Sequence, residues 1–374
     1  MSSWWLAEET SPLARVLVDS PDVEIVGAGI TGISAALTLA AAGKRVRVHD
    51  AREVAGGASG RNGGFALRGG AMAYDKAREW LGQERAREYW RLTEEYLDRL
   101  AALAGDALRR TGSLRIAADD DEREEIGAEY ESLREDGFAA EWRDDVPRFA
   151  AAIFHPDDAA VQPARLVRRL AARAIEAGVE VREHHRVESL DELETERVLV
   201  ATDGYPSGLL GGLGGLIIPT RGQMIATEPI AERLFDCPHY GRHGFDYWQQ
   251  LPDGRITAGG FRDFALDSEF TADEVTTSPI QEALERFVAE LVGRPLRVEH
   301  RWAGIFGLVL DFLPVVGRVP GDERTWVAGG YSGHGNVLGF MCGDLVAKAM
   351  LGDEHPLLGM FDPARLLQLD AGEI

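Results

Sequence analysis

VEIVGAGITGISAALTLAAAGKRVRVHD, residues 23–50, joins a β-branched run to a glycine-rich turn, an alanine-rich segment and a second apolar run. The glycines follow the pattern G-x-G-x-x-G at Gly27, Gly29 and Gly32. The first permits a tight strand-to-helix turn, the second lets the backbone approach a pyrophosphate, and the third lets helix and strand pack closely. Asp50 closes the second strand, where it can accept hydrogen bonds from a ribose. The order predicts a βαβ unit that binds a dinucleotide; the alternative is a glycine-rich turn in another kind of βαβ unit.

A second glycine-rich run follows at once, AREVAGGASGRNGGFALRGG at residues 51–70. Its few polar side chains include Ser59, Arg61 and Asn62. A domain that binds NAD would normally continue into another βαβ unit here. A stripped backbone can instead lie flat and offer its N–H groups to a large planar ligand that carries a pyrophosphate. The alternative is a flexible loop, although long loops inside compact domains tend to be functional or disordered.

The rest of the chain alternates between helical and strand-like patterns. Helices are expected over 72–105, 119–137, 163–177 and 271–293, and strands near 111–119, 179–190, 195–207, 222–227, 244–250, 255–261 and 296–302. Residues 317–352 predict a strand, a glycine turn and a helix. His184 and His185 are adjacent on an expected strand and would point to opposite faces, so we interpret them as surface residues and predict no metal site.

Composition narrows the class of protein. The chain has 374 residues, of which 45% are hydrophobic, enough for one large core or two coupled ones. A net charge of −22 makes nucleic acid and anionic membrane surfaces unfavourable partners. Cys237 and Cys342 form no C-x-x-C pair, and no run of 18 apolar residues occurs. We therefore expect a cytoplasmic protein without disulfides, and leave its oligomeric state open.

The motifs of the whole chain resemble those of the FAD-dependent D-amino-acid oxidase (DAO) superfamily, which contains glycine and sarcosine oxidases. They are most similar to those of gamma-glutamylputrescine oxidoreductase-like proteins. The motifs are WWLAEE (4–9), VGAGITGISAALTLA (26–40), GGASGRNGG (56–64), PTRGQMIATEPI (219–230), DYWQQLPDGRITAGG (246–260), RWAGIFGLVLDFLPVVG (301–317) and AGGYSGHGNVLG (328–339). Their order and spacing make the set specific.

This resemblance implies an α/β fold in which a Rossmann-type FAD-binding domain is interleaved with an α+β substrate domain on a mainly antiparallel sheet. The FAD-binding domain would comprise residues 1–75, 145–215 and 315–374, and the substrate domain residues 76–144 and 216–314. The implied FAD-binding residues are Gly27, Gly29, Ile30, Thr31, Gly32, Asp50, Ala51, Arg52, Gly57, Ala58, Ser59, Arg61, Asn62, Gly63, Gly64, Phe65, Val187, Ala201, Thr202, Gly204, Gly304, Gly330, Ser332, Gly333, His334, Gly335, Asn336 and Val337.

The resemblance also implies oxidation of the C–N bond of a primary or secondary amine or an amino acid. The flavin N5 would accept a hydride equivalent, the imine product would hydrolyse, and oxygen would be the electron acceptor. The alternatives are a flavin-dependent dehydrogenase or tailoring enzyme with another substrate and acceptor, and a non-catalytic flavoprotein. The candidate catalytic residues are His334, Tyr247, Trp248, Arg221 and Trp302.

Each candidate has an alternative interpretation. Tyr247 and Trp248 are neighbours on an expected strand, so one of them faces away from the pocket. Arg221 could bind a carboxylate or hold the sheet to the flavin domain. Asp311 precedes Pro314 and Gly317 and is better explained as a turn carboxylate.

Departures from the sarcosine oxidase pattern bear on substrate choice. The lysine that holds the carboxylate there is absent, and Asn336-Val337 follows the motif instead. Gly304 or a neighbour stands in place of the tethering cysteine, so the FAD should be non-covalent. The lysine linked to oxygen reactivity falls near Thr257. We therefore expect an aromatic pocket with few fixed positive charges, suited to an amine larger than glycine or sarcosine. Arg255 or Arg262 could replace the lost charge.

Overall fold

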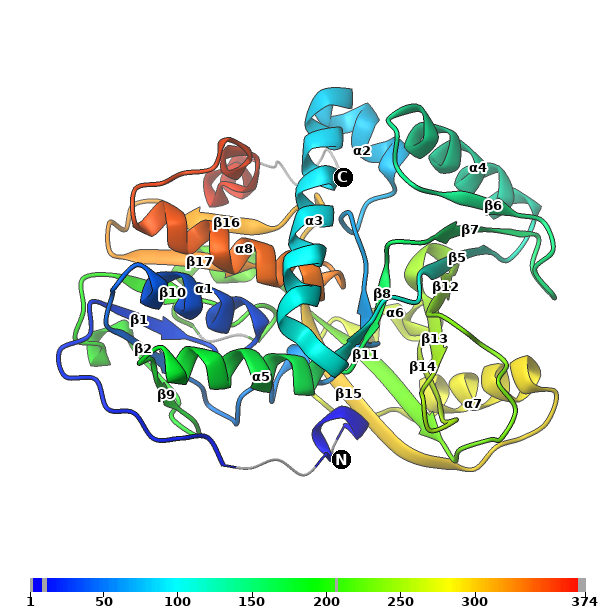
Figure 1. The fold of residues 1–374 in the computed structure, drawn as a ribbon, viewed down its shortest axis with the longest axis horizontal. Helices are drawn as coiled ribbons and strands as arrows, with labels where there is room; N and C mark the ends of the chain where they lie inside the picture. Colours follow the sequence, from blue (N-terminus) through cyan, green and yellow to red (C-terminus); the bar gives the residue numbers. More distant parts are fainter. Residues whose placement is uncertain (1–2, 9–11, 206–207, 369–374) are drawn as a thin grey trace.

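The computed structural model describes residues 3–8, 12–205 and 208–368, which form two main sheets connected by a long helix (Figure 1). The six-stranded sheet has the order β16-β17-β10-β1-β2-β9. Its strands are β1 (Val23–Val26), β2 (Val46–His49), β9 (Glu180–Arg182), β10 (Val198–Val200), β16 (Val315–Arg318) and β17 (Thr325–Gly329). All neighbours in it are parallel except β16 and β17.

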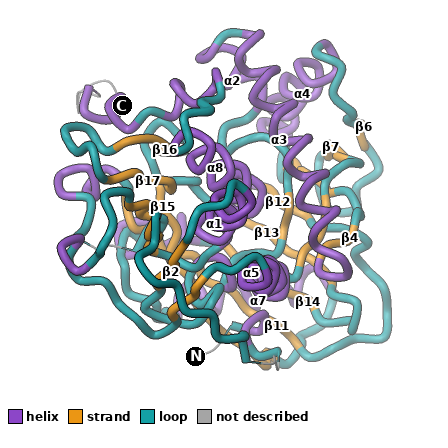
Figure 2. Tube along the Cα trace, turned by 60° about the vertical axis from the view of Figure 1, so that its left-hand side comes forward, coloured by secondary structure: helices purple, strands orange, loops and turns teal. Residues whose placement is uncertain are grey.

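Three helices cover one face of this sheet. They are α1 (Ile30–Ala41), α5 (Pro163–Glu176) and α8 (Gly335–Met350). Figure 2 views them nearly end-on, with α1 between α8 and α5. The βαβ unit expected at residues 23–50 is therefore confirmed, with α1 as its crossover helix and β2 parallel to β1.

The second sheet has eight strands in the order β15-β11-β14-β13-β12-β5-β7-β6. These are β5 (Ser113–Ala117), β6 (Glu141–Arg143), β7 (Ala151–His155), β11 (Ile218–Thr227), β12 (His239–Gly241), β13 (Asp246–Gln250), β14 (Ile256–Gly260) and β15 (Val298–Leu308). Within this eight-stranded sheet, only the β12–β5 pair is parallel among the described residues. The associated helices are α4 (Asp120–Glu135), α6 (Leu266–Glu269) and α7 (Ser278–Val292).

A small third sheet and two helices connect the large sheets. The sheet comprises β3 (Phe65–Ala66), β8 (Ala159–Val161) and β4 (Leu108–Arg109), and the helices are α2 (Tyr74–Leu81) and α3 (Gln83–Ala104). Helix α3 stands between the sheets in Figure 1 and packs on α8 and α5. The 3-10 helices are η1 (Trp4–Leu6), η2 (Ala58–Gly60), η3 (Gly105–Ala107), η4 (Leu190–Glu192), η5 (Gly211–Leu216), η6 (Arg242–Gly244), η7 (Arg262–Ala265), η8 (Pro356–Phe361) and η9 (Pro363–Gln368).

The expected fold class is confirmed, and two details differ. Strand β7, within the range 145–215 assigned to the FAD-binding domain, pairs with β5 and β6 of the larger sheet, so that part of the range lies with the other sheet. The division into two domains otherwise stays a prediction. His184 and His185 do not lie on a strand, because β9 ends at Arg182 and His184 has a φ of 55°. Both side chains are exposed.

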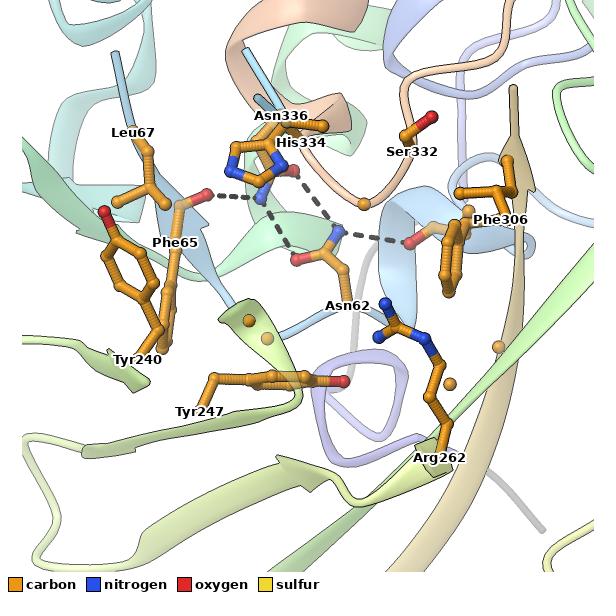
Figure 3. A pocket seen from close by; sticks show the side chains of 18 of the residues that line it. Asn62, Phe65, Leu67, Tyr240, Tyr247, Arg262, Phe306, Ser332, His334 and Asn336 are labelled. Atoms are coloured by element: carbon orange, nitrogen blue, oxygen red, sulfur yellow. Dashed lines mark hydrogen bonds between the residues drawn. The ribbon is translucent and has the colours of Figure 1, made fainter. Parts of the chain in front are cut away.

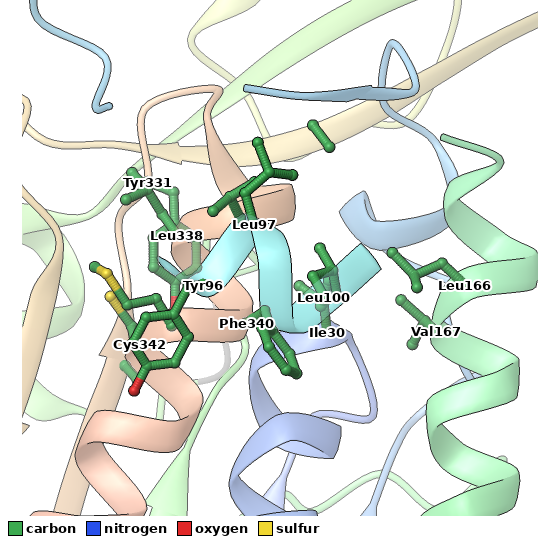
Figure 4. Close-up of a cluster of buried hydrophobic side chains, with 14 of the residues drawn as sticks. Ile30, Tyr96, Leu97, Leu100, Leu166, Val167, Tyr331, Leu338, Phe340 and Cys342 are labelled. Atoms are coloured by element: carbon green, nitrogen blue, oxygen red, sulfur yellow. The ribbon is translucent and has the colours of Figure 1, made fainter. Parts of the chain in front are cut away.

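The contact between α1 and α8 depends on small residues. A Cβ on Gly343 would lie 2.3 Å from the carbonyl oxygen of Thr31, so the two backbones nearly touch. The Ser34 hydroxyl donates a hydrogen bond of 2.6 Å to the carbonyl of Phe340 across the same contact. Leu97 and Leu100 of α3 lie over the crossing in a buried apolar cluster (Figure 4).

This contact gives the first prediction. Replacing Gly343 with alanine favours the helical state by about 1 kcal/mol, but here the new methyl group would collide with backbone. Overpacking of this kind costs about 1–3 kcal/mol, so we expect a net loss of stability. Gly127 of α4 is the matched control, because its nearest foreign atom would be 4.0 Å from an added Cβ. Gly127→Ala should leave the free energy of unfolding unchanged or raise it. Thermal denaturation of the holoproteins measures both, and a stabilised Gly343→Ala variant would contradict the prediction.

Candidate active site

An elongated cavity of about 350 Å³ opens at the carboxyl ends of β1, β2 and β10. We call it the nucleotide cavity. Ligands of open parallel sheets bind at this edge, where neighbouring connections leave in opposite directions. Residues from the α1 N-terminus, the turn after β2, the segment around Val187 and the end of β10 line it.

The N-terminus of α1 forms the floor of the nucleotide cavity. Gly29 precedes the helix, and a Cβ on it would lie 2.9 Å from the Ser59 hydroxyl. The N–H of Ile30 donates to this hydroxyl at 3.0 Å. The remaining N–H groups of the first turn and the helix dipole favour a phosphate at this end.

Asp50 is held at the end of β2 by the backbone. Its carboxylate accepts hydrogen bonds from the N–H of Ala28 at 2.6 Å and of Arg52 at 2.8 Å. Burial raises the pKa of the Asp50 carboxyl. The side chain lines the nucleotide cavity, as the expected ribose contact requires, and that contact stays a prediction.

A cluster that the sequence did not predict closes the side of the nucleotide cavity. Glu274, from the segment between α6 and α7, pairs with Arg52 at 2.7 Å and Arg61 at 3.4 Å. It also accepts a hydrogen bond from the Tyr205 hydroxyl. These four residues come from three separate segments of the chain, so only the tertiary structure reveals the cluster.

A second cavity of about 200 Å³ continues from the first (Figure 3). We call it the ring cavity. The two share the lining residues Ala58, Asn62, Phe306, Gly333 and Asn336. It lies between the glycine-rich run, the N-terminus of α8 and the strands β11, β13 and β15.

Asn62 and Asn336 join the glycine-rich run to α8. Each side-chain amide donates to the other, at 3.2 and 3.1 Å, and Asn336 also donates to the carbonyl of Phe65 at 2.7 Å. Figure 3 shows the hydrogen bonds of this pair, and both residues line both cavities. It fixes the run against the start of α8.

Missing side chains keep the ring cavity open. A Cβ on Gly63 would lie 3.0 Å from the Tyr247 ring, and one on Gly304 would lie 2.8 Å from Cβ of Arg61. The joined cavities therefore fit a long ligand with a dinucleotide at one end and a planar ring at the other.

Comparison with known proteins agrees with this geometry. A family model described as FAD dependent oxidoreductase (DAO) matches residues 22–349. The chain belongs to this family. FAD is accordingly the cofactor of the enzyme. The resemblance of the sequence motifs to this family is thereby confirmed.

Individual relatives cover nearly the whole chain. The protein is 26% identical to Probable oxidoreductase OrdL of Haemophilus influenzae, over 97% of this chain and 90% of that protein. It is 27% identical to gamma-glutamylputrescine oxidoreductase of Escherichia coli, over 89% of this chain and 84% of that protein. The crystal structure of glycine oxidase from Geobacillus kaustophilus superposes with a TM-score of 0.75 at 21% identity, covering 92% of this chain and 98% of that one. At this identity the structural likeness supports the fold alone.

Most residues expected to bind FAD in this DAO-family enzyme lie around the two cavities. The nucleotide cavity is lined by Gly27, Gly29, Ile30, Thr31, Asp50, Ala51, Arg52, Gly57, Ala58, Ser59, Asn62, Val187, Ala201, Thr202, Gly333, Gly335 and Asn336. The ring cavity is lined by Ala58, Arg61, Asn62, Gly63, Phe65, Gly304, Ser332, Gly333, His334 and Asn336.

Five expected residues line neither cavity and have packing roles instead. They are Gly32, Gly64, Gly204, Gly330 and Val337. A Cβ on Gly32 would lie 1.9 Å from the carbonyl oxygen of Gly27, and one on Gly204 would lie 2.3 Å from the backbone of Phe306. These glycines let backbone segments approach each other behind the site.

Of the aromatic pair on β13, Tyr247 faces the ring cavity and Trp248 does not. Trp248 is buried on the other side of the sheet, 5.1 Å from the ring of Phe287 and 5.7 Å from that of Phe149. The candidate role of Trp248 is therefore wrong, and strand alternation is the reason. Burial raises the pKa of Tyr247 to about 12, so its hydroxyl remains protonated.

Arg221 and Trp302 are also placed away from the substrate side. Arg221 forms a buried two-point pair with Glu269, at 2.7 and 2.9 Å, so it neither faces the ring cavity nor reaches the flavin domain. The indole of Trp302 donates to the carbonyl of Arg61 at 2.9 Å. It supports the glycine-rich run from behind, and direct catalytic roles for both residues are wrong.

His334 lines the ring cavity at the N-terminus of α8. Burial lowers its pKa to about 4, so the imidazole is neutral at neutral pH. The start of α8 directs its dipole at the cavity and favours negative charge there.

Two arginines, Arg61 and Arg262, line the ring cavity, so the expectation of few fixed positive charges is not contradicted. Arg262 lines the ring cavity, and no carboxylate of the described residues forms an ion pair or hydrogen bond with it. Its guanidinium lies 4.3 Å from the Phe245 ring centre and 5.6 Å from that of Phe306. Figure 3 shows it directed at the same space as the Tyr247 hydroxyl. Arg255 instead pairs with Asp253 and Glu299 outside the cavity.

Other sequence-based interpretations can be placed as well. Asp311 is a turn carboxylate, since it accepts from the N–H of Leu313 at 3.1 Å and pairs with Arg365 at 2.7 Å. Thr257 lies outside both cavities. Cys237 and Cys342 are free and buried, and neither lines a cavity. Over the residues described, no cluster of three or more potential ligands could hold a metal, and no helix has the length and apolarity to cross a membrane.

Asp50 provides the second prediction. A charge-assisted hydrogen bond contributes about 1.5–3 kcal/mol, so Asp50→Ala should weaken FAD binding by roughly ten- to a hundredfold. Titration of the apoprotein with FAD, followed by flavin fluorescence, gives the dissociation constant. Asp106→Ala, a surface change, is the control. An unchanged affinity of the Asp50 variant would show that another residue holds the ribose.

The third prediction concerns attachment of the flavin. Gly304 lines the ring cavity, and both cysteines are buried elsewhere, so no thiol is placed to form a bond with the ring. Acid precipitation of the yellow protein should release all of the flavin into the supernatant as FAD. Colour retained in the washed pellet would contradict it.

Proposed function

We propose that this enzyme oxidises the C–N bond of an amino acid to an imine, which then hydrolyses in water. Arg262 carries the proposal, because it is a cation in the ring cavity without a carboxylate partner among the described residues. A partly buried charge is costly unless a partner is supplied. A substrate carboxylate would supply it.

The neighbouring residues are suited to orient such a substrate. Burial lowers the pKa of Arg262, but the ordinary pKa of a guanidinium is so far above neutral pH that the group keeps its charge. The protonated hydroxyl of Tyr247 can donate a second hydrogen bond to the carboxylate. Phe306 and Phe65 add apolar surface, which disfavours a charged amine and so promotes the neutral form.

The flavin supplies the redox chemistry, and the protein binds and orients the substrate. Bound FAD accepts a hydride equivalent from the carbon that carries the nitrogen. The protein holds that carbon in place, excludes water and favours negative charge beside the start of α8. The neutral imidazole of His334 contributes no charge that would oppose the substrate amine.

The relatives support the same reaction class. One relative is named for gamma-glutamylputrescine and another, from Bacillus licheniformis and 26% identical, for glycine, so both names denote compounds with an amine and a carboxylate. Oxygen is the proposed acceptor, and one hydrogen peroxide per flavin on readmission of air would distinguish it from another carrier. A cytoplasmic location belongs to the same proposal.

Anaerobic reduction of the flavin by a panel of D- and L-amino acids and simple amines tests the proposal. An amino acid should bleach the visible flavin band, and Arg262→Gln should raise its apparent dissociation constant by roughly ten- to a hundredfold. The limiting reduction rate should change less. Arg255→Gln, which alters a paired arginine outside the cavity, should have little effect.

Two outcomes would overturn this assignment. One is bleaching by amines without a carboxylate and by no amino acid. The other is an amino acid whose affinity does not respond to Arg262→Gln.

A further inference from the structure

A third cavity, of about 260 Å³, adjoins the ring cavity. We call it the polar chamber. The two share the lining residues Leu67, Ala71, Tyr240, His243, Gly244 and His334. Residues of β5, β7, β12, α2, α3 and α4 line the chamber. Neither the FAD nor the reacting amine accounts for it.

The charged residues that line the polar chamber already have partners, which are either opposite charges or hydrogen-bond donors; Glu122, for example, accepts from the N–H groups of Ala118 and His243. Arg68 pairs with Glu94 at 2.9 Å, and Arg115 pairs with Glu129. Asp158 accepts from the Ser113 hydroxyl at 2.6 Å and from the N–H of Arg68 at 3.0 Å. The chamber therefore offers no unpaired acid or base comparable to Arg262.

Two uncharged polar groups on lining residues of the chamber have no hydrogen-bond partner among the described residues. Arg68 donates to Nδ1 of His155 at 3.1 Å. Burial lowers the pKa of His155 well below its ordinary value, so the ring is neutral and its proton must sit on Nε2. This Nε2–H and the Tyr240 hydroxyl have no hydrogen bond to any described residue.

Charge favours neither an anionic nor a cationic ligand, because three carboxylates and three cations line the chamber. A carboxylate entering the chamber would meet the carboxylates of Glu122, Glu129 and Asp158. An ammonium group would meet Arg68 and Arg115. An uncharged group that both donates and accepts meets neither repulsion. It can accept a hydrogen bond from the Nε2–H of His155 and form another with the Tyr240 hydroxyl, and leaving these groups without partners would cost free energy.

We propose that the polar chamber binds an uncharged hydrogen-bonding group, in its simplest form an amide, at the far end of the substrate. The inference rests on the proposed function, because the ring cavity must hold the reacting amine. Together the two cavities indicate a substrate that is an amino acid with a long side chain ending in an amide.

Fragment binding tests the chamber independently of catalysis. Butyramide, butyrate and butylamine have the same chain and differ in the terminal group. Titrated into the FAD-bound enzyme at neutral pH and followed by ligand-observed NMR, butyramide should give the tightest binding that depends on the chamber. Tyr240→Phe should weaken it about three- to tenfold, the effect of one neutral hydrogen bond.

Two further variants separate the chamber from the ring cavity. Ala73→Leu places a larger side chain in the chamber alone and should abolish butyramide binding, while butyrate still binds near Arg262. Tyr130→Phe is the matched control, since Tyr130 packs on Trp142 outside all three cavities. An affinity for butyramide that is unchanged in both Tyr240→Phe and Ala73→Leu would overturn the inference. Chamber-dependent binding of butyrate or butylamine that is tighter than that of butyramide would overturn it as well.

Substrate comparison then distinguishes this inference from the proposed function. Nε-acetyl-lysine should reduce the flavin with a kcat/KM at least about tenfold above that of norleucine or lysine, a gap of roughly 1.4 kcal/mol in barrier. If norleucine reduces the flavin with a kcat/KM equal to that of Nε-acetyl-lysine, the chamber assignment fails and the proposed function stands. If neither reduces it but butyramide binds as expected, the chamber remains and the proposed function fails.

Discussion

The close approach of the backbone around α1 is the constraint on which the rest of the molecule depends. Gly32 allows the helix to start directly over the carbonyl of Gly27, and Gly343 brings α8 against the same helix. A Cβ at either position would overlap backbone atoms, so the elements would have to move apart. The N-termini of α1 and α8 would then no longer face the same pair of cavities. Helix dipoles act only at short range, so this packing sets the electrostatics of the flavin site.

The site itself forms where the two large sheets meet. The six-stranded sheet supplies the dinucleotide end, and the eight-stranded sheet supplies the wall that carries Tyr247 and Arg262. Polar contacts join the two parts. Asp203, after β10, accepts from the N–H of Gly307 in β15 at 3.0 Å and of Gly330 at 2.8 Å. Glu274 reaches back from the substrate side to the two arginines beside the cofactor.

Polarity changes in steps along the three cavities. The nucleotide cavity is built from backbone N–H groups, the ring cavity is largely aromatic with one unpaired cation, and the polar chamber has paired charges with spare neutral donors. A chain with a net charge of −22 therefore keeps one arginine without an acidic partner at its centre. Such a cation is expensive unless a ligand neutralises it, which makes the site selective for its substrate.

The sequence by itself determined the βαβ unit, the fold class and most of the cofactor cavity, because these depend on local features. Glycine spacing dictates a turn, and a run without side chains leaves room for a ligand wherever it folds. It also limited Tyr247 and Trp248 to opposite faces, since strand alternation is local. Only the tertiary structure decided which of them faces the cavity, because that depends on which side of β13 the other sheet lies. The same holds for Arg221, Arg255 and Arg262, three similar cations on strands or strand ends. Glu269 neutralises Arg221, and the neighbouring Asp253 together with the distant Glu299 neutralises Arg255. Arg262 has no such partner among the described residues, because it projects where the sheets leave a cavity.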